Sequence, residues 1–510
     1  MSVGDRIVYG EKRGTIRFIG EVPPFAGTWF GIDWDCPNDG KHDGTYKGVR
    51  YFSATYPKSG SFVKSTDVNF GYKFVDALKE QYDYDVDKAR KEYENSMKDF
   101  DVAVFDFVNL EKVKLLQGPL NSLQVVNLAA YNICGPGDPN EIEEACPNIV
   151  DLDLSNNLIT SWEAIAIIGR QLKKLKSLSL NDSRLQIPED PKQYSDAFTK
   201  LLHLFLCRTV YSWNDILNLA SMWPQIETLK VPFCNIDVLE APPQILFHNL
   251  KHLDIQGNKI YKWSEICKLG HLPRLEILNA CDTGITEIII PPEERLFLKL
   301  QTLYVSENYI KNYVDIIDLN NLPALKDLRI NKNPLTTSDK FLSYREKIIA
   351  RIGNLKILNG REIQPDERRS AEYDYLREFA KDWFCSKNDE KEKAKFLFEN
   401  PRYPLLVQKY GPAEVPTEID PSLKGHLISI NLVYVTEDGA KEIIKKRVHL
   451  SLAVYKLIAI AKRAFNIDTE SPNLVRISSK NPAIKVEMSD QLKSMNIYAV
   501  EDGDTIYINC

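Results

Sequence analysis

The middle of the chain repeats a single pattern of hydrophobic and polar positions. The pattern is L-x-x-L-x-L-x-x-N-x-L, and it is clear in segments such as IVDLDLSNNLI and LKHLDIQGNKI. Successive copies start 24 to 26 residues apart. A period this steady predicts a stack of short units, each of which adds one strand to a concave face and packs its leucines against the next unit. The copies start at Leu123, Ile149, Leu175, Leu201, Ile226, Leu250, Leu275, Leu300 and Leu325.

The ninth position of this pattern carries small or amide side chains, with Tyr131 as the exception. In such units the ninth side chain hydrogen-bonds backbone groups that the turn leaves unpaired, and an unpaired buried group costs roughly 1 to 3 kcal/mol. We therefore interpret residues 119–385 as a leucine-rich-repeat solenoid with its C-terminal cap, and these side chains as scaffold. They are Asn157, Ser183, Thr209, Cys234, Asn258, Thr283, Asn308 and Asn333.

Helical patterns border the repeats on both sides. The segment YKFVDALKEQYDYDVDKARKEYENSMKDF carries charges at helical spacing, which predicts a connecting helix and N-terminal solenoid cap within residues 73–118. After the last repeat, IGNLKILNG is typical of one more strand, and the pattern turns helical after Pro365. We expect this segment to close the C-terminal end of the solenoid.

The composition changes after this cap. Residues 386–424 are rich in Lys, Glu and Pro, which predicts a linker with a short ordered middle. Residues 425–510 then show two strands, an amphipathic helix and further strands, an order that suits a ubiquitin-like β-grasp domain. The sequence ends in YINC without the Gly-Gly that conjugation of a ubiquitin-like tail requires. We therefore interpret this domain as a docking module rather than a tag.

Glycines punctuate short β-type segments in residues 1–72, which is typical of a small, tightly turned β-barrel. The stretch DGKHDGTYKGVRYF does not fit a phosphate loop, because Asp35 stands where the first glycine of G-x-x-x-x-G-K-[ST] belongs. It also lacks the further His or Cys partners that a metal site needs. We interpret Gly40, Gly44 and Gly48 as structural glycines beside a peptide-binding groove.

The segments GTIRFIG, GTWFGIDWD, GKHDGTYKGVRYF and GSFVK together resemble the CAP-Gly domain family. Members of this family grip the C-terminal Glu-Glu-Tyr or Glu-Glu-Phe tails of α-tubulin and of end-binding proteins. The resemblance implies that lysines meet the acidic groups of the tail and that aromatic rings bury its terminal ring. One departure is PFAGTW, which is a residue shorter than the usual F-A-x-G-x-W. The tail-binding residues that the resemblance implies are Trp29, Lys41, His42, Phe62 and Lys64.

His42 is a second departure, because the general family has Asn at this position. A histidine titrates near neutral pH. If His42 contacts an acidic tail as a cation, the tail affinity should rise as the pH falls from about 8 to about 6. If His42 only braces the loop, the affinity should stay flat over this range.

The expected architecture is multidomain, of α/β and β classes, with a CAP-Gly β-barrel, a leucine-rich-repeat solenoid and a ubiquitin-like β-grasp domain. This layout, with G-K-H-D-G and a NPRYPLLVQKYG segment, resembles the family of tubulin-folding cofactors. The resemblance implies a protein that binds the α-tubulin tail through the CAP-Gly domain and the α-tubulin body through the solenoid. It also implies that the protein promotes assembly or dissociation of the α/β heterodimer with cofactors B, C and D.

Two other functions stay open at this point. A microtubule-associated scaffold would share the CAP-Gly domain, although the sequence has no sustained heptad run for dimerisation. An adaptor of the ubiquitin pathway would use the C-terminal domain to dock on the proteasome, which is also compatible with the tubulin-folding role. We expect a cytoplasmic, cytoskeleton-associated protein.

The outward positions of the repeat strands and the turns beside them carry aromatic and arginine side chains amid mixed charge. Such residues are common anchors of protein interfaces. We expect this face to bind the folded body of α-tubulin. The residues selected at the fifth and eighth positions of the repeat are Phe205, Arg208, Phe233, Tyr304 and Arg329.

Composition and charge narrow the function further. The 510 residues have a formal net charge of -6 and a pI near 5.8, which argues against nucleic-acid and membrane partners because both need a basic surplus. No segment approaches the roughly 18 apolar residues of a spanning helix. The nine cysteines never form a C-x-x-C pair, so free thiols are expected. No nucleotide fingerprint or catalytic motif is present, and we predict a non-enzymatic protein without cofactor or metal.

Overall fold

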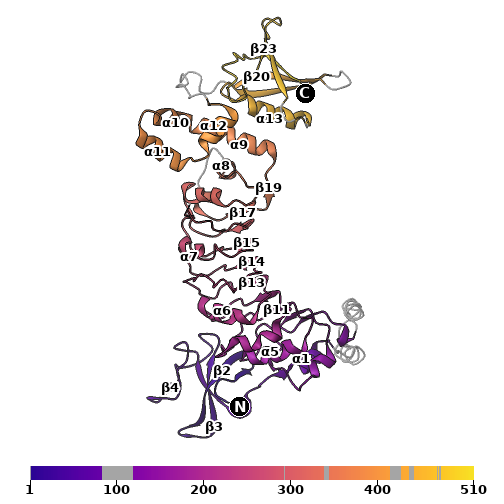
Figure 1. The fold of residues 1–510 in the computed structure, drawn as a ribbon, viewed down its shortest axis with the longest axis vertical. Coiled ribbons are helices and arrows are strands. Elements are labelled where there is room, and N and C mark those ends of the chain that lie inside the picture. The colour runs from indigo at the N-terminus through magenta and orange to yellow at the C-terminus, as the bar shows by residue number, and fades with distance from the viewer. Residues whose placement is uncertain are drawn as a thin grey trace, which may run out of the picture. The chain divides into compact units, whose positions relative to one another are not determined.

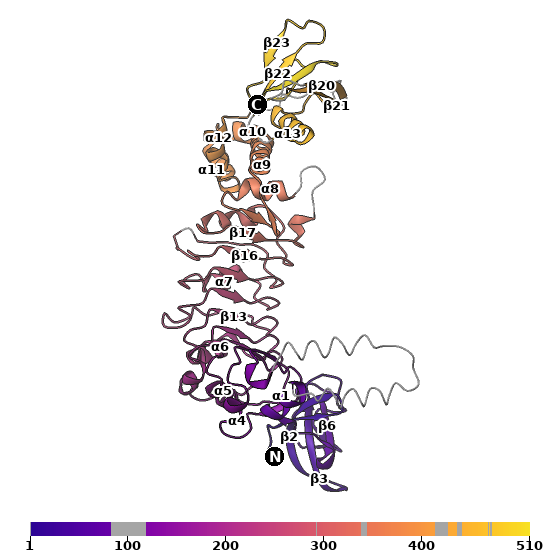
Figure 2. The same ribbon diagram turned by 90° about the vertical axis from the view of Figure 1, so that its right-hand side faces the viewer.

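The computed structural model divides the chain into two compact units (Figures 1 and 2). The first comprises Met1–Ile285 and Pro291–Asn308, and the second comprises Thr286–Ile290 and Tyr309–Cys510. Each unit therefore holds part of the repeats. The structure describes residues 2–82, 119–291, 293–337, 344–413, 427–435, 441–467, 469 and 472–509.

The first unit begins with a small antiparallel sheet in the order β1-β2-β3-β6. Ile7, Ile16 and Phe30 are among the residues of its buried core. The strands β4 and β5 form a separate ribbon, and among the described residues no pairing joins β6 to β1, so strand pairing does not close the predicted barrel. The elements are β1 (Arg6–Tyr9), β2 (Lys12–Val22), β3 (Phe25–Trp34), β4 (Thr45–Tyr46), β5 (Val49–Arg50), β6 (Gly60–Lys64) and the 3-10 helix η1 (Ser65–Asp67).

Short parallel strands form the repeats of the first unit, which confirms the period seen in the sequence. Neighbouring strands pair in register, so that Leu152, Leu178 and Leu204 lie side by side in the core. Because side chains alternate along a strand, the residues on either side of each leucine point away from this core. These strands are β8 (Val125–Asn127), β10 (Asp151–Asp153), β11 (Ser177–Ser179), β12 (His203–Phe205), β13 (Thr228–Lys230), β14 (His252–Asp254), β15 (Ile277–Asn279) and β16 (Thr302–Tyr304).

The ninth-position side chains bind the backbone as the sequence predicts. Asn157 donates from Nδ2 to the carbonyl oxygens of Leu128 at 2.8 Å and Leu154 at 2.9 Å. Its Oδ1 accepts a hydrogen bond from the N–H of Ile133 at 2.9 Å. Asn258, further along the repeats, makes the same kinds of bonds to the backbone of its own repeat and of the preceding repeat. Their role in the scaffold is confirmed.

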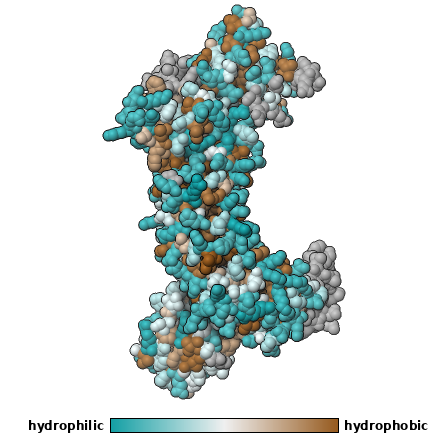
Figure 3. Space-filling model, viewed as in Figure 1, coloured by the Kyte–Doolittle hydropathy of each residue, from teal (hydrophilic) through white to brown (hydrophobic). Residues whose placement is uncertain are grey.

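Helices and 3-10 turns return the chain between the strands. Ser161 begins one of them by accepting a hydrogen bond from the N–H of Ala164, and Ser212 and Asp215 form a capping box at another. Hydrophilic residues cover most of the face drawn in Figure 3, with apolar residues in scattered patches. The elements are η2 (Leu120–Ser122), α4 (Glu141–Ala145), α5 (Trp162–Gln171), η3 (Pro191–Phe198), α6 (Trp213–Leu219), η4 (Ala220–Met222) and α7 (Trp263–Cys267).

A two-stranded parallel pair joins the N-terminal domain to the first repeat. Its strands are β7 (Tyr72–Lys73) and β9 (Ile133–Gly135). Helix α1 (Phe74–Tyr82) follows β7 directly and buries Phe74 and Leu78, so a helix starts where the sequence predicts the connecting helix. The rest of that prediction, over residues 83–118, lies outside the described residues.

The second unit contains the last repeat strands and a helical cap. Strand β18 pairs in parallel with β17, and β19 then turns back along β18. Helix α9 starts at Pro365, where the missing N–H of proline costs nothing, and this confirms the predicted change from strand to helix. The elements are η5 (Val314–Asn321), β17 (Asp327–Arg329), η6 (Pro334–Thr336), α8 (Tyr344–Arg351), β18 (Ile357–Leu358), β19 (Arg361–Glu362) and α9 (Pro365–Glu378).

Helices continue where the sequence predicts a linker. Tyr403 and Leu406 are buried, and the ring of Phe396 lies 5.2 Å from that of Tyr403. The prediction is wrong over this part of the chain, because apolar residues at helical spacing pack together despite the polar composition around them. The helices are α10 (Ala380–Ser386), α11 (Glu390–Glu399) and α12 (Tyr403–Tyr410).

The C-terminal domain has the expected β-grasp topology. Its sheet has the order β21-β20-β24-β22-β23, with the parallel pair β20 and β24 at the centre. Helix α13 packs Leu457 and Ala461 against one face, with Ile430, Leu432 and Ile506 in the same core. The elements are β20 (Leu427–Val435), β21 (Lys441–His449), α13 (Val454–Phe465), β22 (Asn473–Ile477), β23 (Lys485–Glu487) and β24 (Thr505–Asn509).

Candidate functional site

The loop that carries the G-K-H-D-G motif lies against the start of β6. The N–H of Lys41 donates to the carbonyl oxygen of Gly60 at 2.7 Å, and the N–H of Gly60 donates to that of His42 at 2.7 Å. A Cβ on Gly40 would lie 2.5 Å from the Gly60 oxygen. Gly44 has a φ of +97°, a conformation that side chains disfavour. The glycines therefore allow the close backbone contact that places Lys41 and His42.

The structure groups aromatic rings around Phe62 of β6. Its ring centroid lies 5.1 Å from that of His42, 5.3 Å from that of Tyr51 and 5.6 Å from that of Phe52. Phe18, which belongs to β2, lies 6.2 Å away. Phe62, Tyr51 and Phe18 are half-buried, so this cluster is an apolar surface and not only a core.

Trp29 and Lys64 form the neighbouring part of the same surface. They are cross-strand partners on β3 and β6, and Lys64 Nζ lies 5.9 Å from the indole centroid. The ring of Phe25, 49% exposed, extends the surface at 5.7 Å from Trp29. Lys41 and Lys64 are exposed, and among the described residues neither makes an ion pair. All five sequence-selected groove residues thus belong to one domain surface of aromatic rings and unpaired lysines.

The sequence analysis did not select three rings of this surface, which are Phe18, Phe25 and Tyr51. A signal was present, because Phe18 and Tyr51 lie within the motif segments GTIRFIG and GKHDGTYKGVRYF. Their contribution depends on the register of β2 against β3, where irregular pairing falls on both sides of Phe18. The sequence pattern does not show such shifts.

The hydrogen bonding of His42 favours a neutral imidazole. Nδ1 accepts a hydrogen bond from the N–H of Gly44 at 3.0 Å, so a proton there would break this bond. Burial lowers the pKa of His42, the carboxylate of Asp43 opposes this, and the cation of Lys41 lowers the pKa further. The hypothesis of a charged His42 near pH 7 is therefore disfavoured, and the structure supports a bracing role.

We expect the affinity of the groove for an acidic peptide to stay flat, within about twofold, from pH 8 to pH 6.5. The reason is that His42 stays neutral until the pH falls below its ordinary pKa of about 6.5. Below that value, the histidine takes up a proton more readily in the unfolded chain than in the folded loop, so the free energy of unfolding falls. Fluorescence anisotropy with a labelled peptide measures the affinity across this range.

His42→Asn is the matched control, because Asn keeps an acceptor for the Gly44 N–H and does not titrate. This variant should give the same flat profile and should keep it below pH 6. An affinity that rises between pH 8 and 6.5 in the original chain, and not in His42→Asn, would contradict the bracing role.

The residues selected on the repeats do not form one cluster. Phe205 lies on β12 and Tyr304 on β16, four strands or roughly 19 Å apart at about 4.8 Å per strand. Arg329 lies on β17, in the second unit. Arg208 and Phe233 are at the turns that follow their strands, with positive φ angles of 54° and 58°.

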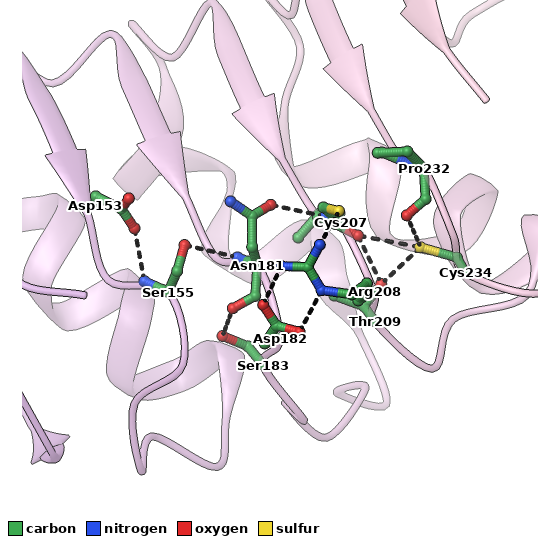
Figure 4. A network of polar contacts seen from close by, with 11 residues as sticks. Asp153, Ser155, Asn181, Asp182, Ser183, Cys207, Arg208, Thr209, Pro232 and Cys234 are labelled. Atoms are coloured by element: carbon green, nitrogen blue, oxygen red, sulfur yellow. Dashed lines mark hydrogen bonds and ion pairs between the residues drawn. The ribbon is translucent and has the colours of Figure 1, made fainter. Parts of the chain in front are cut away.

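Arg208 is held by a neighbouring repeat (Figure 4). Its guanidinium donates to the carboxylate of Asp182 through Nε at 2.7 Å and through Nη2 at 2.6 Å. Phe233 is 44% exposed, and a Cβ on Gly257 would lie 2.1 Å from its ring, so the ring rests on a glycine backbone. Phe233 is thus an exposed aromatic side chain in an uncommon left-handed conformation, and it stays a candidate contact residue.

Comparison with known proteins places this chain in a family. A CAP-Gly domain model matches residues 3–68, and a leucine-rich repeat model matches residues 247–384. Tubulin-specific chaperone E of Danio rerio is 35% identical over an alignment of 521 positions, which covers 99% of this chain and 98% of that protein. The chain belongs to the tubulin-specific chaperone E family. The same protein of Rattus norvegicus is 34% identical over 519 residues, again with 99% and 98% coverage.

The comparison also found a solved structure that matches a part of this chain. It is the solution structure of the C-terminal ubiquitin-like domain of mouse tubulin-specific chaperone E, with 21% identity, coverage of 18% of this chain and 93% of that chain, and a TM-score of 0.16. No helix among the described residues is long and apolar enough to cross a membrane. No group of three or more His, Cys, Asp and Glu residues in the described parts could hold a metal ion.

In this member of the tubulin-specific chaperone E family, polar contacts hold the CAP-Gly domain against the first repeats. Arg13 donates to Oδ1 of Asn132 at 2.9 Å and to the carbonyl oxygen of Ala130 at 3.1 Å. Asp35 pairs with Arg184 of the repeats at 3.5 Å and with Arg6 of its own domain. The aromatic surface of the CAP-Gly domain and the first repeat strands are therefore parts of one unit. No sequence motif marks these contacts.

Proposed function

We propose that this chain is a tubulin-folding cofactor that holds α-tubulin at two places. The groove of the CAP-Gly domain takes the C-terminal tail, and the outward face of the repeat strands takes the folded body. Membership of the tubulin-specific chaperone E family supports the role, since the relatives carry tubulin in their name.

The chemistry of the groove carries the proposal. Lys41 and Lys64 are exposed and form no ion pair among the described residues; Lys64 lies over the ring of Trp29, and Lys41 precedes His42, whose ring lies beside Phe62. Acidic side chains and a terminal carboxylate suit the lysines, because charge-assisted hydrogen bonds are the stronger kind. A terminal aromatic ring suits the exposed rings. An acidic tail that ends in Tyr or Phe offers both.

The contacts of Arg13 and Arg184 support simultaneous binding at the two places. When one site is occupied, the second contact becomes intramolecular, and avidity can exceed either affinity by 10²-fold or more. The cofactor then acts by binding rather than by catalysis. Assembly or dissociation of the α/β heterodimer follows from a difference in affinity between free and dimeric α-tubulin, since a ligand shifts an equilibrium only by its differential affinity.

Further partners belong to the same proposal. Cofactors B, C and D would join on surfaces that the α-tubulin contacts leave open, with the complex in the cytoplasm and at the cytoskeleton. The β-grasp domain would supply a docking surface for a partner such as the proteasome. Its sheet leaves one face free of α13, with Ile443 exposed beside Lys441 and Lys445 on the edge strand β21.

The tail contact is tested with a peptide that ends in Glu-Glu-Tyr. We expect the double variant Lys41→Gln, Lys64→Gln to bind it at least about tenfold more weakly, because each charge-assisted hydrogen bond contributes roughly 1.5 to 3 kcal/mol. Lys79→Gln removes an exposed charge from α1 and should leave the affinity unchanged. Fluorescence anisotropy measures both. Equal affinity in the double variant and the original chain would overturn the proposed groove.

A further inference from the structure

Three basic side chains lie together on the outward face of strands β12, β13 and β14. The register places His203 beside Thr228 and Thr228 beside His252, so the two histidines flank β13. Lys230 lies two residues after Thr228 and points to the same side of the sheet. Neighbouring strands are about 4.8 Å apart, so these side chains share a patch about two strands wide.

The central leucines show which side of the sheet this is. Leu204, Leu229 and Leu253 are fully buried at the middle position of the three strands. The histidines and Lys230 occupy the positions on either side of these leucines and are half-buried. The patch therefore faces away from the core and is open to a partner.

One carboxylate faces the three basic side chains, that of Asp254, which is the cross-strand partner of Lys230 but forms no ion pair with it. Among the described residues, Lys230 makes no ion pair, and its Nζ lies instead 5.3 Å from the ring centroid of Phe205. The nearest carboxylate along the register is that of Asp254, which accepts a hydrogen bond from the N–H of Gln256 at 3.0 Å. Other basic residues nearby are paired, as Lys251 is with Glu227 at 2.9 Å.

The charged groups that face the patch change the pKa of His252. Burial lowers the pKa of His252, the cation of Lys230 lowers it further, the carboxylate of Asp254 raises it, and His203 lowers it. The flanking strands β11 and β15 contribute only Ser and Ile or Asn side chains to this face. An anion placed beside His252 would oppose the effect of Lys230 and favour protonation of His252.

We infer that His203, Lys230 and His252 bind an acidic segment of the protein that this chain holds, with Phe205 contacting the apolar part of that segment. The inference rests on the proposed function, in which that protein is α-tubulin, and it names the chemistry of the body contact. The carboxylates of the segment accept hydrogen bonds from Lys230, from a ring N–H of His203 and from protonated His252. Binding therefore takes up protons and strengthens as the pH falls from 8 to 6.5.

The test uses the full chain and tubulin whose acidic C-terminal tails have been removed, so that the CAP-Gly groove does not contribute. Calorimetry in two buffers of different ionisation enthalpy gives both the affinity and the number of protons taken up. We expect Lys230→Gln to weaken binding at least about tenfold. The double variant His203→Gln, His252→Gln should lose the proton uptake and the pH dependence. Lys259→Gln, an exposed lysine past the turn of the same repeat region, should match the original chain.

The outcomes separate this inference from the proposed function. If the original chain binds neither intact nor tail-free tubulin, the proposed function itself fails. If it binds intact tubulin only, or if the Lys230 and histidine variants bind tail-free tubulin with unchanged affinity and proton uptake, the inference is overturned while the tail contact stands.

Discussion

Replacing Glu372 by alanine is expected to destabilise the helical cap by about 3 to 5 kcal/mol, the range measured when one partner of a buried ion pair is removed. Glu372 is 1% exposed on α9. Its carboxylate accepts hydrogen bonds from Arg402 at 2.9 Å, Lys409 at 2.9 Å and Tyr410 at 2.7 Å, all at or beside α12. Without it, Arg402 keeps its charge in a largely buried place without its ion-pair partner, whereas Lys409 is exposed and contributes little.

The pH dependence of this contribution has a definite sign. Burial raises the pKa of Glu372, but hydrogen bonds from Lys409, Tyr410 and Arg402 outweigh it, and the folded pKa is lowered. A lowered carboxyl pKa adds stability above the unfolded value of about 4.3, and that stability is lost as the pH falls through the folded value. The full effect of Glu372→Ala should therefore appear at pH 7 and shrink in acid.

Native-state hydrogen exchange of the α12 amides measures this opening locally, which suits a multidomain chain whose unfolding is not two-state. Glu392→Ala on the exposed face of α11 is the matched control and should leave α12 exchange unchanged. If the α12 amides exchange at the same rate in the Glu372→Ala and Glu392→Ala variants at pH 7, the Glu372 carboxylate does not hold α12 on α9.

The same network explains why the sequence predicts a linker where the structure has helices. Composition averages over neighbours along the chain, and residues 386–424 are locally rich in Lys and Glu. The stabilising partner of Arg402 and Lys409 is Glu372, which is 30 and 37 residues earlier. A pairing over that distance leaves no local signal. By contrast, the repeats are predicted well because each unit contacts only its neighbours, so the local period reports the fold.

The candidate site residues were likewise predictable only where a local sequence motif marks them. Lys41 and Lys64 could be selected because their motif segments carry the pattern of the CAP-Gly family, and the glycines set the loop that holds them. The patch at His203 and His252 escaped selection because its residues have no shared motif, and only the register of the strands brings them together. Phe233 was selected at the eighth position of the repeat, and its left-handed backbone conformation is not marked by that pattern.

Comparing Gly44 with Gly48 separates the effect of a close backbone contact from the effect of left-handed strain. We expect Gly44→Ala to abolish tail-peptide binding and to destabilise the N-terminal domain by roughly 3 kcal/mol or more, beyond the 1 to 2 kcal/mol of left-handed strain alone. Gly44 has a φ of +97°, and a Cβ there would lie 2.0 Å from the carbonyl oxygen of Phe52. Because that obstacle is backbone, the loop carrying Lys41 and His42 must move away.

Gly48→Ala is the control, because Gly48 also has a positive φ, of +82°, but no atom lies within 4 Å of its Cβ position. Its cost should be limited to left-handed strain of about 1 to 2 kcal/mol, with peptide affinity within about threefold of the original. Hydrogen exchange of the β6 amides and peptide anisotropy measure the two effects separately. If both substitutions are equally harmful, backbone strain alone accounts for the motif. If only Gly44→Ala abolishes binding, the closeness of the loop to Phe52 is what shapes the groove.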